Sequence, residues 1–337
     1  MDIVTRENKL FWGYWKYLID TVHYQHPAYS SVGLEFYKEY FFSDMTVKDE
    51  SFIVVNNGVA IIGIVLSVHA ENNLIRMSGF GRGINYMENS NGNCEGIKSA
   101  RKIFKKNFES IVKSNHVNTL FMTDYTSVDG TLSLLARLFL DRGGVAQTNY
   151  LQLIDLAKPT ELIHSDLSKS CRNSVNWGRN NLDISYIDAS SITKNNVEDL
   201  RQLHIHEAGR ETRSKKSWEL MYDMINENVA FILEGRLDGS LVTSSLFYYN
   251  KPVCLYAVSA STRALFDKPI GHIILWEAIN QAKKLGCKYF DFGGLSYNSS
   301  EEVVSKKQID INRYKKNFGG ETIIQLNINW HTEEIPS

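Results

Sequence analysis

The sequence has few of the residues that mark disulfide-rich, disordered or membrane-spanning chains. Only 4 cysteines and 5 prolines occur among 337 residues. The cysteines are scattered, with no CxxC pair and no histidine spacing suited to zinc, so we expect a reduced cytoplasmic protein without a metal site. No apolar run reaches the length of a membrane span, and the N-terminal residues lack the pattern of a signal peptide.

An excess of either charge is also missing. The net charge is −1, from 37 basic and 38 acidic side chains, which argues against a broad DNA-binding surface. A local basic groove is still compatible with these numbers, so a tRNA partner stays open as an alternative. Hydrophobic residues make up 43% and aromatic residues 12% of the chain, which is typical of an ordered globular protein. The length is sufficient for two domains with sizeable cores.

The first half of the chain reads as an antiparallel hairpin, a helix and a strand. β-Branched runs at Phe52–Val55 and Val59–His69 flank an Asn-Asn-Gly turn, which is a hairpin signal. Apolar residues at helical spacing predict a helix from about Glu95 to Ser114. The strand Thr119–Asp124 follows and ends on an aspartate.

The second half repeats this order. Strands are predicted at Val229–Glu234, Leu241–Tyr249 and Val253–Ser259, with a Gly-bearing turn over residues 235–239. An amphipathic helix over Gly271–Leu285 comes next, and then a strand over Lys288–Phe292 that we expect to stop at a Gly pair.

The two halves therefore predict a duplicated unit at an offset of about 175 residues. We expect an α/β fold of two domains, residues 1–150 and 151–337, each with a mixed central sheet flanked by helices. The boundary lies near Tyr150–Pro159, where a strand leads into the second half. Further helices are predicted at Leu132–Asp141, Leu162–Arg179, Asn196–Ala208 and Lys216–Asn226.

The stretch Pro269–Glu321 contains the most informative group of candidate functional residues. A helix that starts at Gly271 presents unpaired N–H groups and a positive dipole end, which suit an anion. Asp291 follows on a strand next to Gly293 and Gly294, and Lys315 lies further along. Carboxyl ends of strands are where α/β proteins tend to place their sites, so this stretch predicts an anion cradle with a carboxylate and a lysine.

Four segments together resemble the FemABX family of tandem acyltransferase-fold proteins and the related acetyltransferases with a duplicated GNAT (acyl-CoA N-acyltransferase) fold. They are the basic segment Ser168–Asn180, the segment His204–Arg213 followed by Trp218, the segment Pro269–Gly294, and Tyr314–Gly320 with its aromatic-Lys-x-x-Phe pattern. The resemblance is strongest from Ser165 to Glu321. Like FemX-type members, the sequence shows no long helical arm.

This resemblance implies acyl transfer without a covalent enzyme intermediate. The first reading is transfer from an acyl-CoA, with acetyl-CoA the first candidate, to the amine of a nucleotide-linked sugar or cell-envelope precursor. The alternative within the fold is FemX-type transfer from an aminoacyl-tRNA to a peptidoglycan precursor. A third reading is a non-catalytic binding module of the same fold. The near-neutral charge favours coenzyme A over tRNA.

The resemblance also implies roles for individual residues. Lys315 would stabilise the oxyanion at the reacting carbonyl, and Asp291 would act as general base or hold the substrate amine. Either residue is equally consistent with a plain surface lysine or a loop-capping aspartate. Asp124, the counterpart of Asp291 in the first half, is better explained as a structural residue.

Substrate and donor contacts are predicted on four further positions and one turn. Arg213 would bind the acceptor diphosphate, and Lys38 and Arg82 would meet phosphates of the same ligand. Tyr256, on the predicted strand Val253–Ser259, is a further candidate for substrate contact. The turn before the helix supplies the candidates for the coenzyme A pyrophosphate: Lys268, Gly271 and His272. Ile273 stands where the usual pattern has a small residue, which weakens that cradle.

Overall fold

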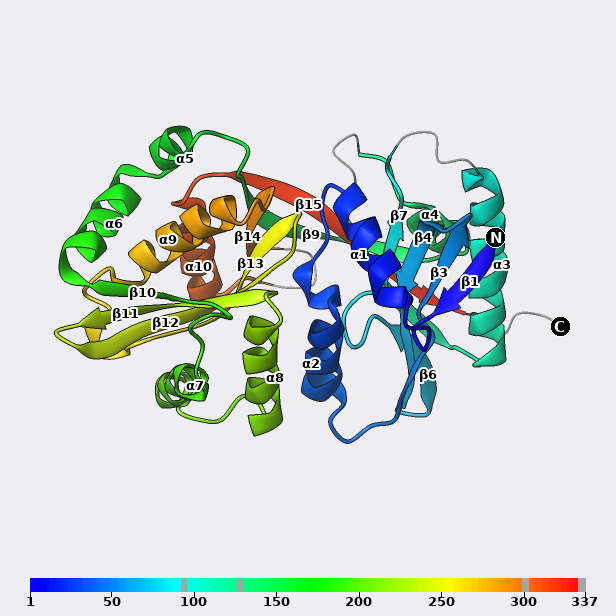
Figure 1. The fold of residues 1–337 in the computed structure, drawn as a ribbon, viewed down its shortest axis with the longest axis horizontal. Helices are drawn as coiled ribbons and strands as arrows, with labels where there is room; N and C mark the ends of the chain where they lie inside the picture. The colour runs from blue at the N-terminus through cyan, green and yellow to red at the C-terminus, as the bar shows by residue number, and fades with distance from the viewer. Residues whose placement is uncertain (92–95, 126–129, 299–302, 333–337) are drawn as a thin grey trace. The chain divides into compact units, whose positions relative to one another are not determined.

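The computed structural model describes residues 1–91, 96–125, 130–298 and 303–332. Its chain divides into two compact units, and Figure 1 shows their elements. Unit 1 comprises Met1–Gln25, Tyr37–Asn149 and Ile324–Ser337; unit 2 comprises His26–Phe36 and Tyr150–Ile323. The predicted boundary near residue 150 falls where unit 1 gives way to unit 2, but each unit also takes a segment from the other half of the sequence.

Unit 1 contains two sheets around the helix α3 (Ile97–Ser114). The first sheet has the order β1-β3-β4-β7, formed by Asp2–Thr5, Phe52–Asn56, Val59–Val65 and Asn85–Glu88. In the second, the neighbours run β15-β8-β6-β5-β2, formed by Glu321–His331, Thr119–Asp124, Leu74–Ser78, Ser67–Glu71 and Val47–Asp49. The helices α1 (Phe11–Thr21) and α4 (Leu134–Asp141) complete the unit, together with the later part of α2 (Ser31–Phe42).

The predicted hairpin and helix of this half are confirmed, with one correction. β3 pairs with β4 across the Asn-Asn-Gly turn, and α3 buries Ala100, Phe104 and Phe108 at helical spacing. The run Val59–His69 is two strands rather than one, because β4 ends at Val65 and β5 begins at Ser67 in the other sheet. The core of the unit includes Trp330, whose ring lies edge-on to Phe139 at 5.4 Å.

Unit 2 has one mixed sheet with helices on both faces. The strand order is β10-β11-β12-β13-β14-β9, formed by Asp183–Ile187, Ala230–Leu237, Ser240–Tyr249, Val253–Ser261, Tyr289–Leu295 and Val145–Asp155. The helices α6 (Lys169–Asn181) and α9 (Ile270–Lys284) cover one face, while α7 (Lys194–Ala208) and α8 (Lys215–Asn226) cover the other (Figure 1). The strands β11, β12 and β13 form the predicted meander, and β14 pairs parallel to β13 after α9.

Three predicted features of this half are wrong in detail. The range Leu162–Arg179 is two helices, α5 (Thr160–Asp166) and α6, because Ser168 interrupts the helix and caps α6 by accepting a hydrogen bond from the Cys171 N–H. The turn after β11 is shorter than 235–239, since β11 extends to Leu237 and β12 starts at Ser240. The last strand does not stop at the Gly pair; β14 continues through it to Leu295.

The segment that carries Lys315 is a helix, α10 (Lys306–Lys316), which the sequence analysis did not predict. Its N-terminus is fixed by a capping box in which Ser305 and Gln308 exchange side-chain and backbone hydrogen bonds. Lys315 therefore lies in the last turn of a helix, where the negative end of the helix dipole favours a cation. Among the described residues, no helix is long and apolar enough to cross a membrane.

Candidate active site at the parted strands of unit 2

The parallel strands β13 and β14 pair over a short stretch and then separate. Their register joins Val253–Leu255 to Tyr289–Asp291, and the described residues show no further pair between these strands. Beyond that point β14 pairs with β9, and within the part of the chain that the structure describes, one edge of β13 from Tyr256 onward carries no partner strand. Strand edges of this kind expose backbone donors and acceptors.

Both strands carry an irregularity at the point where they part. Leu246 of β12 pairs with Val258 and Phe247 with Tyr256, so Ala257 is an extra residue on β13. The register of β14 with β9 shifts between Asp291 and Gly294. Bulges of this kind bend a strand and redirect its side chains, and they are frequent next to active sites.

Asp291 is buried at this point, with 1% of its surface exposed. Its Oδ1 accepts a hydrogen bond of 2.6 Å from the Gly293 N–H. Gly293 itself has a φ of +78°, which favours glycine. Phe290 and Phe292 both belong to the core beneath α9. Because strand side chains alternate, Asp291 lies on the opposite face of the sheet.

Lys315 reaches the same bulge from α10. Its Nζ donates a hydrogen bond of 2.6 Å to the Gly294 carbonyl oxygen. Burial lowers the pKa of the Lys315 ammonium, and the negative charge of Asp291 acts in the opposite direction. The structure thus brings together the two predicted catalytic residues at the Gly pair, with the lysine held beside a carbonyl group and close to a carboxylate.

Tyr256, Gly271 and His272 lie on the α9 side of this site, around Tyr314. The His272 ring packs edge-on to Tyr314 at 4.9 Å, and a Cβ on Gly271 would lie 3.2 Å from the Tyr314 hydroxyl oxygen. Burial raises the pKa of Tyr314 well above its ordinary value, and the Tyr256 hydroxyl adds to that shift. Sequence reasoning missed Tyr314 as a site residue, although it directly precedes Lys315 in a segment that carries the resemblance.

The role predicted for the turn before α9 in binding a coenzyme A pyrophosphate stays a prediction, and the structure shows what the residues of the turn contact. The side chain of Ile273 is 1% exposed and contacts α6, where a Cβ on Gly178 would lie 2.5 Å from its Cγ2. Burial lowers the pKa of His272, so its ring is favoured as a neutral aromatic partner of α10 rather than a cation. Lys268 lies half-buried in the turn itself. Two of the first residues of α9 are therefore engaged in packing.

Arg213 lies in the corner between α7 and α8. It donates a hydrogen bond of 3.2 Å to His204 Nε2, and its guanidinium lies 5.7 Å from the ring centroid of Trp218. Burial, and secondly the charge of Arg213, lowers the pKa of His204. This geometry orients the guanidinium, but these contacts involve none of the residues at the parted strands.

Lys38 and Arg82 belong to unit 1. Lys38 is exposed on α2, and Arg82 stacks over the neighbouring Tyr37 at 5.0 Å from the ring centroid. The Arg82 side chain also donates to the Tyr37 hydroxyl at 3.4 Å. Their role toward a substrate stays a prediction.

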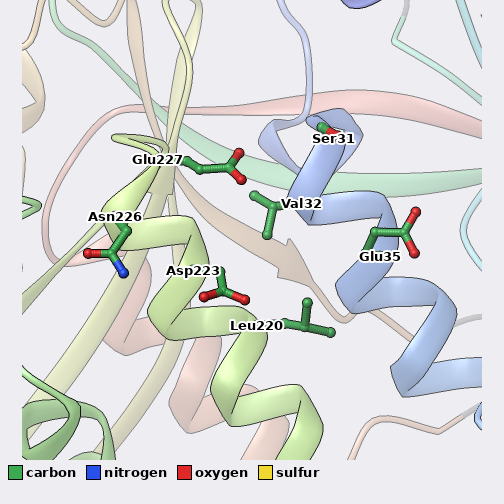
Figure 2. Close-up of a pocket in the computed structure, with 7 residues that line it drawn as sticks. All are labelled: Ser31, Val32, Glu35, Leu220, Asp223, Asn226 and Glu227. Atoms are coloured by element: carbon green, nitrogen blue, oxygen red, sulfur yellow. The ribbon is translucent and has the colours of Figure 1, made fainter.

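A cavity of about 320 Å³ in unit 2 lies between α2 and α8, as Figure 2 shows. Sequence analysis predicted none of the residues that line it, and three of them are acidic. They are Ser31, Val32, Glu35, Leu220, Asp223, Asn226 and Glu227. The described residues contain no group of three or more histidines, cysteines or carboxylates arranged to hold a metal ion.

Comparison with solved structures agrees with this architecture. The crystal structure of FemX matches with a TM-score of 0.73 and 12% sequence identity, over 97% of both chains. The chain has a FemX-like fold. A tandem GNAT protein from the clavulanic acid biosynthesis pathway matches with a TM-score of 0.52 and 13% identity, over 100% of this chain and 99% of that one. The L-PGS of Bacillus licheniformis matches with a TM-score of 0.54 and 10% identity, over 81% and 82%.

These likenesses confirm the predicted FemX-like α/β architecture of two tandem GNAT-like domains. No protein-family model and no curated protein matches the sequence. At identities this low, the FemX-like fold is established by shape, and the chemistry has to be argued from the residues of this chain.

Proposed function

We propose that the protein is an acyltransferase that moves an acyl group from an acyl-CoA, acetyl-CoA first, to the amine of a nucleotide-linked sugar or cell-envelope precursor. The observation that supports it most is the Lys315 ammonium held 2.6 Å from the Gly294 carbonyl where β13 and β14 part. A cation fixed beside an open strand edge is what a developing oxyanion needs.

The strand edge supplies the donor site in this proposal. An extended chain with amide groups can pair with an exposed strand edge through backbone hydrogen bonds. The pantetheine arm of an acyl-CoA has two amides and would lie along β13 from Tyr256 onward. Its thioester would then reach the bulge at Ala257, close to the end of β14.

The proposed reaction is direct. The acceptor nitrogen attacks the acyl carbon, the new C–N bond forms, the C–S bond breaks, and the departing thiolate takes the proton that the amine loses. An ammonium has three N–H donors, so Lys315 can keep its bond to Gly294 while it donates to the oxyanion. Asp291 acts as a positioning residue, because its charge favours the cationic lysine and its Oδ1 holds the Gly293 N–H.

The nucleotide part of the acceptor is proposed from Arg213. Its guanidinium is oriented by His204 and Trp218, and a planar fork of donors suits a diphosphate. Lys38 and Arg82 are proposed as further phosphate contacts.

FemX-type transfer from an aminoacyl-tRNA is the second candidate, and one observation favours it. Ile273 and His272 are engaged in packing at the start of α9, which leaves less of the helix terminus for a coenzyme A pyrophosphate. The net charge of −1 favours the opposite conclusion, because tRNA binding usually needs a basic face.

A donor assay on matched variants tests the proposal. We expect acetyl-CoA turnover that resists ribonuclease, and a loss of about 100-fold in kcat for Lys315→Ala, as for removal of other oxyanion donors. The neighbouring Lys316→Ala is the control, since Lys316 is exposed and lies over Tyr297. Ribonuclease-sensitive activity would favour the tRNA donor. Full turnover by Lys315→Ala would remove the oxyanion role, and the lack of any turnover would favour a binding module.

A further inference from the structure

The α9 face of unit 2 carries a group of hydroxyls next to the parted strands. Ser245 of β12, 2% exposed, donates a hydrogen bond of 2.9 Å to the Ser259 hydroxyl of β13. Both serine side chains also interact with the Tyr256 hydroxyl, and they lower its pKa against the larger opposite effect of burial. We call Tyr256, Ser245 and Ser259 the hydroxyl trio.

The surroundings of the hydroxyl trio are apolar. The Tyr256 ring stacks on Phe247 at 5.7 Å, and Phe247 lies 6.0 Å from Phe290 in the core beneath α9. Each hydroxyl has one donor and two acceptor positions, so the hydrogen bonds within the trio leave acceptor positions that a ligand hydroxyl can use. In these apolar surroundings, a ligand without a polar group gains none of these bonds.

The hydroxyl trio lies where the donor would bind. Tyr256 directly follows Leu255, the last residue of β13 that pairs with β14, and Ser259 lies two residues after the extra residue Ala257. Tyr256 and Ser259 are half-buried, so part of the trio is open to a ligand. In the proposed acyl transfer, on which this inference rests, the acyl group of the donor would lie there.

We infer that the acyl group carries a hydroxyl substituent next to its carbonyl, and that the hydroxyl trio selects it. A neutral hydroxyl can both donate to and accept from the trio. An ammonium substituent would instead require a nearby carboxylate once it is desolvated. Asp291, the carboxylate of this site, lies on the other face of the sheet. A hydroxyacyl donor is therefore favoured over both an aliphatic and an aminoacyl donor.

Three isosteric donors test the inference on the intact protein: glycolyl-CoA, propionyl-CoA and glycyl-CoA. They differ only in a hydroxyl, methyl or ammonium group on the carbon next to the carbonyl. We expect kcat/KM to be at least about tenfold higher for glycolyl-CoA than for either of the others. Tyr256→Phe and Ser259→Ala should each reduce the ratio of glycolyl to propionyl transfer by about fivefold, the effect of one net hydrogen bond.

Ser261→Ala is the matched control. Ser261 lies on the same face of β13, two residues after Ser259, and shares a hydrogen bond of 2.8 Å with Thr243 of β12. The variant therefore loses a hydroxyl–hydroxyl contact of the same kind outside the trio. Its donor ratio should equal that of the wild type. A purely structural role of the hydroxyl trio would lower transfer from all donors together and leave the ratio unchanged.

The possible outcomes distinguish a failure of the hydroxyacyl preference from a failure of the proposed acyl transfer. Transfer that is as fast from propionyl-CoA, or faster from glycyl-CoA, overturns the hydroxyacyl preference and leaves acyl transfer intact. Absence of transfer from every acyl-CoA, including acetyl-CoA, overturns the proposed function and the inference with it. The ratio of glycolyl to propionyl transfer is measured on the wild-type protein. It therefore tests the inference even if a variant fails to fold.

Discussion

At the scale of single residues, the protonation state of Lys315 is the quantity that the site controls. Burial favours the neutral amine, and the neighbouring Asp291 favours the ammonium. Oxyanion stabilisation requires the charged form. The balance between these two effects should therefore be visible in the pH dependence of acyl transfer.

We predict that kcat falls as the pH rises through the lowered pKa of Lys315, at a pH below that of an ordinary lysine. Asp291→Asn should move this alkaline limb to lower pH, because it removes the charge that raises the pKa while an amide oxygen can still accept the Gly293 N–H. The measurement is a pH–rate profile of both proteins.

Lys315→Arg is the control for this profile, since a guanidinium stays charged over the whole range. Its residual activity should show no alkaline limb of this origin. An unchanged limb in both variants would assign the titration to another group.

At the scale of secondary structure, the bulge in β14 depends on the backbone of Gly293. Its φ of +78° lies in the left-handed region, and a Cβ there would come within 3.8 Å of the Lys315 Nζ. A side chain at this position therefore has two separate effects, on backbone strain and on the surroundings of the ammonium.

We predict that Gly293→Ala destabilises the protein by about 1–2 kcal/mol and also lowers kcat. Gly286→Ala is matched in strain, because Gly286 follows α9 with the same φ of +78° and has open space around its Cα. It should lose similar stability, measured by chemical denaturation, and keep its kcat. An equal loss of kcat in both would show that strain alone, not the site, is responsible.

The corresponding strand ends in unit 1 are joined rather than parted. β6 and β8 pair in parallel at Arg76–Thr119 and Met77–Leu120, and the chain then returns to β8 at Ile84, which bridges to Met122. The Ile84 N–H donates a hydrogen bond of 2.8 Å to the Phe121 carbonyl. Among the residues that the structure describes, unit 1 therefore offers no free strand edge at this point.

We consequently predict a single donor site per chain. Titration calorimetry with acetyl-CoA should give a stoichiometry near one, and Lys315→Ala should keep that stoichiometry because it removes a charge rather than the strand edge. Two equivalent sites would contradict the distinction drawn between the units.

The sequence predicts most of this architecture because the elements that carry apolar periodicity are the ones that form the cores. The helix α9 is buried at helical spacing, and the strand β11 is buried at six consecutive positions, as a short apolar run predicts. The helix α10 was not predicted because it buries none of its residues completely and has no apolar face; its capping box holds it instead. Glycine usually ends a strand, so the continuation of β14 through its Gly pair was also missed.

The candidate site likewise depends on features that apolar periodicity does not predict. Resemblance pointed to Asp291 and Lys315 separately, but their proximity depends on the position of α10 and on the bulge, which no periodicity encodes. The serines of the hydroxyl trio carried no signal in the sequence, because isolated serines on a strand are common and only the register between β12 and β13 brings them together.

At the scale of the whole molecule, the two units exchange segments. The segment His26–Phe36 belongs to unit 2, where Phe36 packs against Tyr248 at 6.2 Å. The residues from Ile324 onward belong to unit 1, where Ile328 and Trp330 are part of the core. A cut at residue 150 would therefore remove core residues from both units.

We predict that separate fragments 1–150 and 151–337 do not unfold cooperatively on their own, because removal of one large core side chain alone typically destabilises a protein by about 3–5 kcal/mol. Near-ultraviolet circular dichroism during thermal unfolding is the measurement. The control is the intact protein nicked at an engineered protease site in the turn over residues 157–159, directly after β9, which should keep its transition. A sharp unfolding transition in fragment 1–150 would contradict the conclusion that unit 1 needs the segment from Ile324 onward.

The strand β15 has a consequence for the order in which the protein is made. The Thr123 hydroxyl of β8 donates a hydrogen bond of 3.0 Å to Oδ1 of Asn327, a residue 204 positions later. Domains at the amino end of a chain generally fold while the ribosome is still working. Here unit 1 cannot finish its second sheet until β15 has been translated, and β15 follows the other elements of unit 2 in the sequence. The nascent chain therefore has to hold an open edge at β8 while the unit that carries the candidate site is synthesised.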